Sequence, residues 1–186
     1  MKILNKKQSD ECIKHLSLNR MNEVILQGED NEQLINWYFE NRNSKKLFNI
    51  RDKSKNGGKF LYKLTPFEVF ANLPKVGTFS VYESLHIADQ HLILQGDIEI
   101  SKDFIMKASL DDRLGISNRI AMQQPKWSFY NYDLRLKPDP TIKGFKDILA
   151  YICQHELIGM IIEFSLYEIP VGIFNEPVII WELRNY

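Results

Sequence analysis

Two glutamates near the end of the sequence stand where apolar residues are expected. Glu163 and Glu182 each lie between two large apolar neighbours, inside runs that otherwise favour burial. A buried carboxylate needs a partner or a shifted pKa, and such groups cluster at functional sites. Glu163 and Glu182 are therefore the candidate catalytic residues, acting as a general base or as ligands of a cation.

The surrounding pattern indicates how these acids are positioned. An amphipathic helix is predicted over residues 142–156, followed by strands over 160–169 and 177–184 that form a C-terminal hairpin. If the hairpin closes symmetrically, Glu163 comes opposite Glu182. A register shift of one residue would separate the pair.

Like charges placed opposite one another destabilise a hairpin. A protein that keeps Glu163 and Glu182 together could let them share a proton, bind a cation or hold an arginine between them. Arg184 has the same strand parity as Glu182, so these two share a face. The alternative is that this face is exposed and both acids are simply solvated.

A second candidate follows a predicted strand that ends near residue 110. Ser117, Asn118 and Arg119 combine short hydrogen-bond donors with a guanidinium, which suits the binding of an anionic substrate. Together with Arg184 they form the predicted anion-binding set. In the alternative interpretation, Ser117 caps a short helix and the arginines make surface ion pairs.

Residues 42–59 are the one break in composition, with seven basic residues against a single acid. We expect a flexible basic loop within one globular domain of residues 1–186, because too little chain precedes it to make a separate domain. Such a loop could follow a phosphate backbone, although a solvated surface loop is the commoner origin of a charge run.

The order of elements favours an α+β protein. Helix and strand signals do not alternate regularly, which predicts a mixed, mostly antiparallel sheet with helices packed on one face. Residues 91–101 keep one parity across Gly96, which favours a single bent strand over a hairpin that turns at Gly96 and Asp97. The aromatic stretch at 127–136 is predicted to be irregular.

Composition narrows the classes of partner. The 186 residues include 24 basic and 24 acidic side chains, and this balance lowers the expectation of generic nucleic-acid or membrane-surface binding. No apolar run approaches 18 residues and the start lacks the apolar core of a signal peptide, so a cytoplasmic protein is expected. The histidines and the two cysteines lack metal-ligand spacing, and no pattern identifies a cofactor.

Two functions of different classes remain. In the first, the protein binds a small molecule or another protein without catalysis of its own. In the second, it is a small enzyme that acts on a phosphate-bearing or nucleotide substrate, with Glu163 and Glu182 at the reaction centre and Arg119 holding the anion. The convergence of these three side chains in one place would favour the enzyme.

Overall fold

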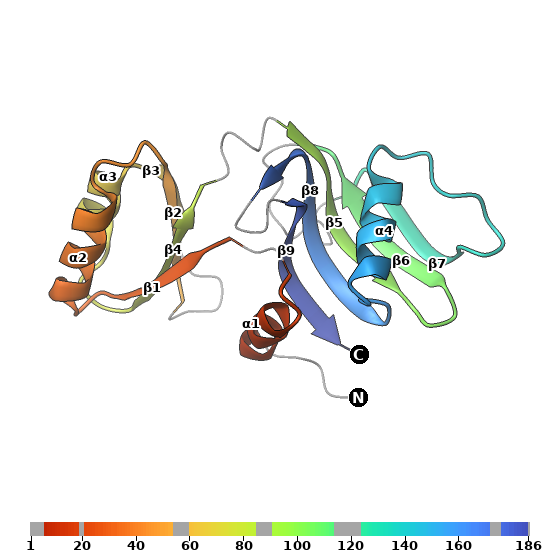
Figure 1. Cartoon of the computed structure of the whole chain (residues 1–186), viewed down its shortest axis with the longest axis horizontal. Coiled ribbons are helices and arrows are strands. Elements are labelled where there is room, and N and C mark those ends of the chain that lie inside the picture. The colour runs from red at the N-terminus through yellow and green to blue at the C-terminus, as the bar shows by residue number, and fades with distance from the viewer. Residues whose placement is uncertain are drawn as a thin grey trace. The chain divides into compact units, whose positions relative to one another are not determined.

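The computed structural model describes residues 6–18, 21–53, 60–84, 91–113, 124–171 and 176–185. These residues belong to two compact units, and the smaller unit, residues 21–86, is inserted in the sequence between residues 1–20 and 87–186 of the larger one. Each unit has its own sheet and helices (Figure 1). Each also has its own cluster of buried apolar side chains. Among the described residues, no helix is both long and apolar enough to cross a membrane.

The smaller unit is a four-stranded antiparallel sheet with two helices packed against it. Its strands, in sheet order, are β1 (Glu23–Gln27), β4 (Thr78–Glu83), β2 (Phe48–Asp52) and β3 (Phe60–Leu64), and its helices are α2 (Asn31–Asn41) and α3 (Pro66–Asn72). A capping box starts α3: the Thr65 hydroxyl accepts from the Glu68 amide at 3.3 Å, and the Glu68 carboxylate accepts from the Thr65 amide at 2.8 Å.

The larger unit is a five-stranded antiparallel sheet with a helix across one face. Its elements are α1 (Lys6–His15), α4 (Phe145–Gln154), and the strands β7 (Trp127–Asp133), β6 (Ile105–Asp111), β5 (Leu92–Ile100), β8 (Met160–Val171) and β9 (Glu176–Asn185), the strands being given in sheet order.

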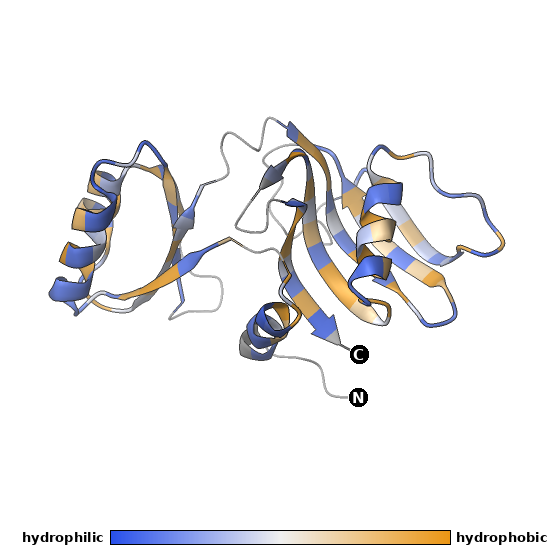
Figure 2. Cartoon of the chain, in the orientation of Figure 1, coloured by the Kyte–Doolittle hydropathy of each residue, from blue (hydrophilic) through white to orange (hydrophobic). Residues whose placement is uncertain are grey.

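The helix α4 buries its apolar stripe in the core of this unit. Phe145, Ile148 and Ile152 are almost completely buried there, and they share one cluster with Ile98 and Ile162 of the sheet. Hydrophobic and hydrophilic residues alternate along parts of the strands (Figure 2), and the face opposite the helix carries polar side chains together with apolar ones such as Ile179. The predicted α+β class and the C-terminal helix with its hairpin are therefore confirmed.

The edge strand β9 is covered in part by α1. The Ser9 hydroxyl accepts a hydrogen bond from the backbone amide of Leu183 at 2.8 Å, and Ile13 of α1 joins the core cluster of the larger unit. The helix thus satisfies a backbone donor that an edge strand would otherwise expose.

The prediction of one long strand across Gly96 is also confirmed, since β5 runs without interruption from Leu92 to Ile100. Gly96 has a φ of 147°, and a Cβ atom there would lie 2.0 Å from the carbonyl oxygen of Ser109 on the neighbouring strand. Both observations require glycine. The strand can therefore bend without losing its pairing to β6.

Two predictions of irregular chain are wrong. Within the predicted basic loop, residues 48–52 form β2, because Phe48 and Ile50 alternate with more exposed residues and are buried against the helices of the smaller unit. Residues 54–59 lie outside the described residues. The segment predicted to be irregular contains the strand β7, in which Asn131 at a φ of 51° accompanies a register shift against β6. The organisation of residues 1–186 as one domain stays a prediction.

Candidate functional site

The register of the C-terminal hairpin places Glu163 of β8 directly opposite Glu182 of β9. The pairing shifts at Trp181, because Ile162 pairs with Leu183 whereas Phe164 pairs with Ile180. This bulge keeps both Ile180 and Leu183 in the core, although they are three residues apart. The same irregularity leaves Glu182 on the polar face of the sheet, beside Glu163.

A third carboxylate joins this pair from the next strand. Asp97 of β5 pairs with Glu163 across the ladder, so the two side chains share a face of the sheet. The adjacent pair, Ile98 with Ile162, faces the core and is fully buried. Three neighbouring strands therefore bring Asp97, Glu163 and Glu182 together on the face opposite the apolar core.

Arg184 lies among these three carboxylates. Its Nε atom donates to Oε1 of Glu182 at 3.0 Å, and an Nη atom lies 3.7 Å from Oδ1 of Asp97 and 3.9 Å from Oε2 of Glu163. Of the possibilities that the sequence left open, an arginine held between the two glutamates is the one that the structure contains. We call Asp97, Glu163, Glu182 and Arg184 the carboxylate–arginine cluster.

The cluster is partly buried, and its carboxyl groups outnumber its guanidinium. The side chain of Glu163 is 12% exposed and that of Asp97 is 20% exposed, while Glu182 is 32% and Arg184 39% exposed. The single positive charge of Arg184 thus lies beside three carboxyl groups.

The carboxylate of Asp97 is partly buried without a complete set of hydrogen bonds. Its Oδ1 atom is buried, and no hydrogen-bond donor of the described residues satisfies it. Burial raises the pKa of Asp97, the guanidinium of Arg184 opposes that rise, and the charge of Glu182 adds to it. A buried oxygen without a donor marks a place where a cation or a donor from a ligand would be stabilising.

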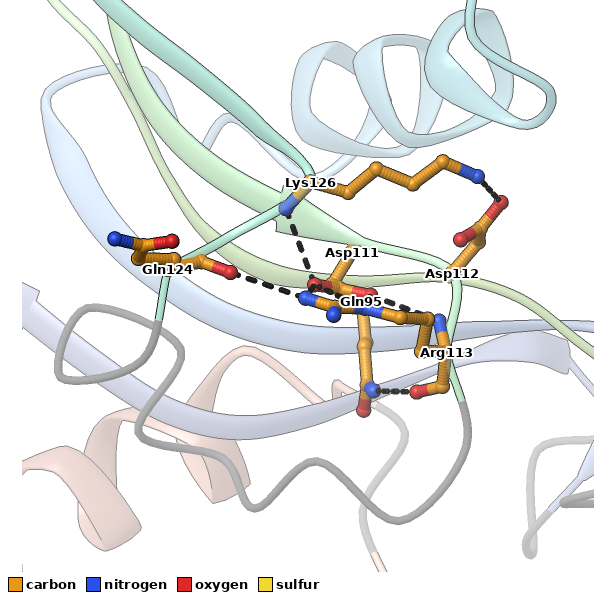
Figure 3. Close-up of polar contacts among 6 residues, drawn as sticks. All are labelled: Gln95, Asp111, Asp112, Arg113, Gln124 and Lys126. Carbon is orange, nitrogen blue, oxygen red and sulfur yellow. Dashed lines mark hydrogen bonds and ion pairs between the residues drawn. The ribbon is translucent and has the colours of Figure 1, made fainter.

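The next row of side chains on the same face forms a second polar cluster. Gln95 of β5 is paired with Ser165 on one side and Asp111 on the other, so Asp111 lies on the face that carries Asp97. Asp111 is fully buried, and its carboxylate accepts from Nε and Nη2 of Arg113 at 2.9 and 2.6 Å (Figure 3).

Backbone donors complete the contacts of Asp111. The amide of Arg113 donates to Oδ1 at 2.9 Å and that of Lys126 donates to Oδ2 at 3.1 Å. These hydrogen bonds, led by the one from the Arg113 side chain, lower the pKa of Asp111 to about 2. The Gln95 side chain adds a bond to the carbonyl oxygen of Arg113 at 2.8 Å.

The Asp111 network joins the two ends of a segment that the structure does not describe. Arg113 precedes residues 114–123, while Lys126 follows them, and the Arg113 guanidinium also donates to the carbonyl oxygen of Gln124 at 3.0 Å. The predicted anion-binding residues Ser117, Asn118 and Arg119 lie in this segment, outside the described residues. Of the predicted site, the structure thus brings together Glu163, Glu182 and Arg184.

The carboxylate–arginine cluster does not have the geometry of a preformed metal centre. Within the described ranges, no three histidine, cysteine, aspartate or glutamate side chains converge closely enough to hold a metal ion. Mg²⁺ does not require such a cage, because it commonly takes one or two carboxylates together with waters and substrate phosphates.

Sequence reasoning missed Asp97 and the Asp111 network. Asp97 was considered only as part of a possible turn, although its parity with Gln95 and Glu99 marks it as a residue of the polar face. The signal that was lacking is the pairing of β5 with β8, which joins residues more than 60 positions apart in the sequence. The register shift at Trp181 does have a local signal, since Ile180 and Leu183 are apolar with a spacing of three.

Comparison with known proteins gives a likeness of fold. No family model matches the sequence, and no curated protein matches it. Among solved structures, a D-alanine–D-alanine ligase from Helicobacter pylori superimposes with a TM-score of 0.52 at 14% sequence identity. The match covers 96% of this chain and 53% of the ligase chain, so this chain spans about half the length of that protein. At this identity, the likeness concerns the fold alone.

Proposed function

We propose that this protein binds a phosphate-bearing ligand together with a divalent cation at the carboxylate–arginine cluster. The observation that carries the proposal is the convergence of Asp97, Glu163 and Glu182, from three adjacent strands, around the single guanidinium of Arg184. Carboxylate oxygens are the ligands that Mg²⁺ prefers, and a guanidinium matches the oxygens of a phosphate. A site for a metal–phosphate complex uses both kinds of group, with carboxylates that bind the metal ion and a guanidinium that binds the phosphate.

A purely structural ion-pair network explains the cluster less well. A network that served stability would satisfy its buried atoms, as the Asp111 network does. Here Asp97 lies beyond hydrogen-bond distance of the guanidinium and keeps a buried oxygen without a donor. That oxygen costs stability in the absence of a ligand, and a bound cation or hydrogen-bond donor would reduce the cost.

We further propose that the protein is an enzyme of the ligase type rather than a binding module without catalysis. The fold likeness to a ligase over nearly the whole chain supports this choice. In this role Glu163, Glu182 and Asp97 hold the cation on the phosphates, and Arg184 contacts the phosphate oxygens and stabilises charge that develops during transfer. Nucleoside triphosphates are the first ligand class to test.

A thermal-shift assay tests the binding proposal. A ligand that binds only the folded state stabilises it by about 2.7 kcal/mol at a concentration of 100 times its Kd, which corresponds to roughly 5–10 °C for a chain of this length. We expect ATP with MgCl₂ or MnCl₂ to raise the melting temperature, and either component alone to raise it less.

Two matched variants locate the effect. The double substitution Glu163→Gln with Glu182→Gln should abolish the shift that ATP and Mg²⁺ produce. The control is Glu168→Gln, on the same strand as Glu163, whose carboxylate is exposed and paired with Lys143; it should keep the full shift. A wild type that shows no shift, or a double variant that keeps it, would refute the proposal.

A further inference from the structure

The two helices of the smaller unit expose large apolar side chains to solvent. Phe39 of α2 is 55% exposed and Phe67 of α3 is 63% exposed, and Ile35, one turn before Phe39, is 41% exposed. A single exposed apolar residue is common on protein surfaces, whereas a contiguous group of them marks an interaction site.

Ring contacts make these side chains contiguous across the two helices, which pack against one another on one side of the smaller sheet (Figure 1). The ring of Tyr38 lies 5.9 Å from that of Phe39 and 4.9 Å from that of Phe70 on α3. Phe67 precedes Phe70 by three residues, so the two are neighbours on the surface of α3. We call Ile35, Tyr38, Phe39, Phe67 and Phe70 the aromatic helix face.

The ionisable groups of these helices are of one sign. Within their bounds, α2 and α3 carry Glu32, Glu40 and Glu68, all exposed, and contain no lysine or arginine. Arg42 follows directly after α2, and its guanidinium lies 4.8 Å from the centroid of the Phe39 ring. The aromatic helix face is therefore an apolar surface among acidic side chains, and one of its rings already attracts a cation.

This charge selects the chemistry of the occupant. A second copy of the same face would bring glutamates against glutamates, and like charges across an interface suppress association. An anionic lipid surface is disfavoured for the same reason, because it attracts basic segments rather than acidic ones. A partner that matches both properties combines an apolar stripe with lysine or arginine side chains beside it.

We propose that the aromatic helix face is a docking surface for a basic amphipathic helix of a partner protein. The apolar stripe of such a helix would cover Phe39 and Phe67, and its flanking basic side chains would lie near Glu32, Glu40 and Glu68. Aromatic residues that become fully desolvated commonly supply most of the binding energy of an interface. The proposal goes beyond the proposed function, because the carboxylate–arginine cluster belongs to the larger unit.

The experiment measures the binding of synthetic peptides to the full chain by fluorescence anisotropy. The probe is a fluorescein-labelled peptide of leucine and lysine, about 14 residues long, patterned as an amphipathic helix. We expect it to bind at least about tenfold more tightly than the same pattern with glutamate in place of lysine. A peptide of the same leucine and lysine content without the helical period should also bind more weakly.

Substitutions of exposed residues locate the binding surface. The double substitution Phe39→Ser with Phe67→Ser should weaken binding of the leucine–lysine peptide by about tenfold or more. Glu32→Lys with Glu40→Lys should weaken it as well, with a smaller dependence on salt concentration than in the wild type. The control is Val76→Ser, which removes a 73% exposed apolar side chain of the same unit outside both helices and should leave the affinity unchanged.

A measurement on the wild type keeps the test independent of whether a variant folds. Chemical shifts of backbone amides in α2 and α3 should change when the leucine–lysine peptide is added. The proposal is overturned if that peptide does not bind, if it binds no better than the glutamate peptide, or if the serine double variant keeps the affinity. Dimerisation of the wild type that the double variant loses would assign the face to a second copy, and binding to anionic vesicles that it loses would assign it to a membrane; either result overturns the proposal.

Discussion

Two aspartates on one face of the same sheet have opposite surroundings. Asp111 is bound by its arginine through two nitrogens and by two backbone amides, and its pKa is lowered to about 2. Asp97, one row along the sheet, has its arginine 3.7 Å away, an oxygen without a donor and a raised pKa. The two residues differ in what their neighbours supply rather than in their own chemistry.

This difference separates a structural role from a functional one. The carboxylate of Asp111 has its hydrogen-bonding capacity used within the protein, so it stabilises the fold and leaves little for a ligand. Asp97 keeps an oxygen without a donor, which a ligand can satisfy on binding. Substitutions at the two aspartates should therefore change stability in opposite directions.

The largest effect is expected from Asp111→Asn. Asparagine cannot accept the paired bonds of the guanidinium as a carboxylate does, and it brings an amide group that needs acceptors of its own. We expect the free energy of unfolding to fall by about 2–4 kcal/mol, as when a buried, charged hydrogen-bond acceptor is lost. Urea unfolding measures this change, and an unaltered midpoint would show that the network is not structural.

Asp133 provides the matched control for Asp111. It binds Arg135 with the same two-residue spacing, through Nε at 3.0 Å and Nη2 at 2.8 Å, but it ends the edge strand β7 and its side chain is 16% exposed, whereas that of Asp111 is fully buried. Asp133→Asn should lower the urea midpoint much less than Asp111→Asn. Equal decreases of the two urea midpoints would mean that burial does not determine how much such aspartate–arginine pairs contribute to stability.

The acid stability of the protein should depend on Asp111. A carboxyl whose pKa is lowered on folding adds stability above its unfolded pKa of about 3.9, and this stability is lost as the pH falls toward the folded value. The wild type should therefore lose stability between about pH 4 and pH 2, and Asp111→Asn should lose less over that window. Unfolding monitored by circular dichroism across this pH range shows whether the free energies of unfolding of the wild type and of Asp111→Asn approach one another in acid.

Asp97→Asn should act in the opposite direction, with a smaller effect. A carboxyl whose pKa is raised on folding favours the folded state below its unfolded pKa and disfavours it progressively as the pH rises. Removing that charge should raise the free energy of unfolding at pH 7 by about 0.5–1 kcal/mol, comparable to one hydrogen bond. The gain should vanish below about pH 4, and a clear loss of stability at pH 7 would contradict the assignment of Asp97.

The smallest change in stability is expected for Glu163→Gln in metal-free protein. Removing one of three carboxylates that surround one guanidinium relieves repulsion and leaves Arg184 with its bond to Glu182. We expect a gain of no more than about 0.5 kcal/mol in urea unfolding near neutral pH. A strong loss would instead indicate a buried ion pair between Glu163 and Arg184, because breaking such a pair leaves a charge uncompensated.

The sequence predicted the parts of the site that depend on local pattern. Alternation and turn signals predicted the C-terminal hairpin, because both strands are close in sequence and strongly apolar. The register was left open: a symmetric closure places Glu163 opposite Glu182, and a shift of one residue separates them. The single bent strand across Gly96 followed from parity alone.

The missing parts depend on contacts between distant segments. Asp97 joins the cluster only through the pairing of β5 with β8, and Lys126 reaches Asp111 only because β6 pairs with β7. No local pattern specifies either pairing. The strand β2 was not predicted, because the many charged residues around it favoured a loop over a strand with only two alternating apolar residues, Phe48 and Ile50. The burial of these two residues depends on helices from other parts of the sequence.

The most direct test of the central claim is anomalous diffraction from crystals grown with MnCl₂ and a non-hydrolysable ATP analogue. We expect an anomalous peak among the carboxyl groups of Asp97, Glu163 and Glu182, with the Arg184 guanidinium turned toward the phosphates of the analogue. Manganese bound elsewhere in the protein, or Arg184 still seated among the three carboxylates beside a bound analogue, would contradict the account.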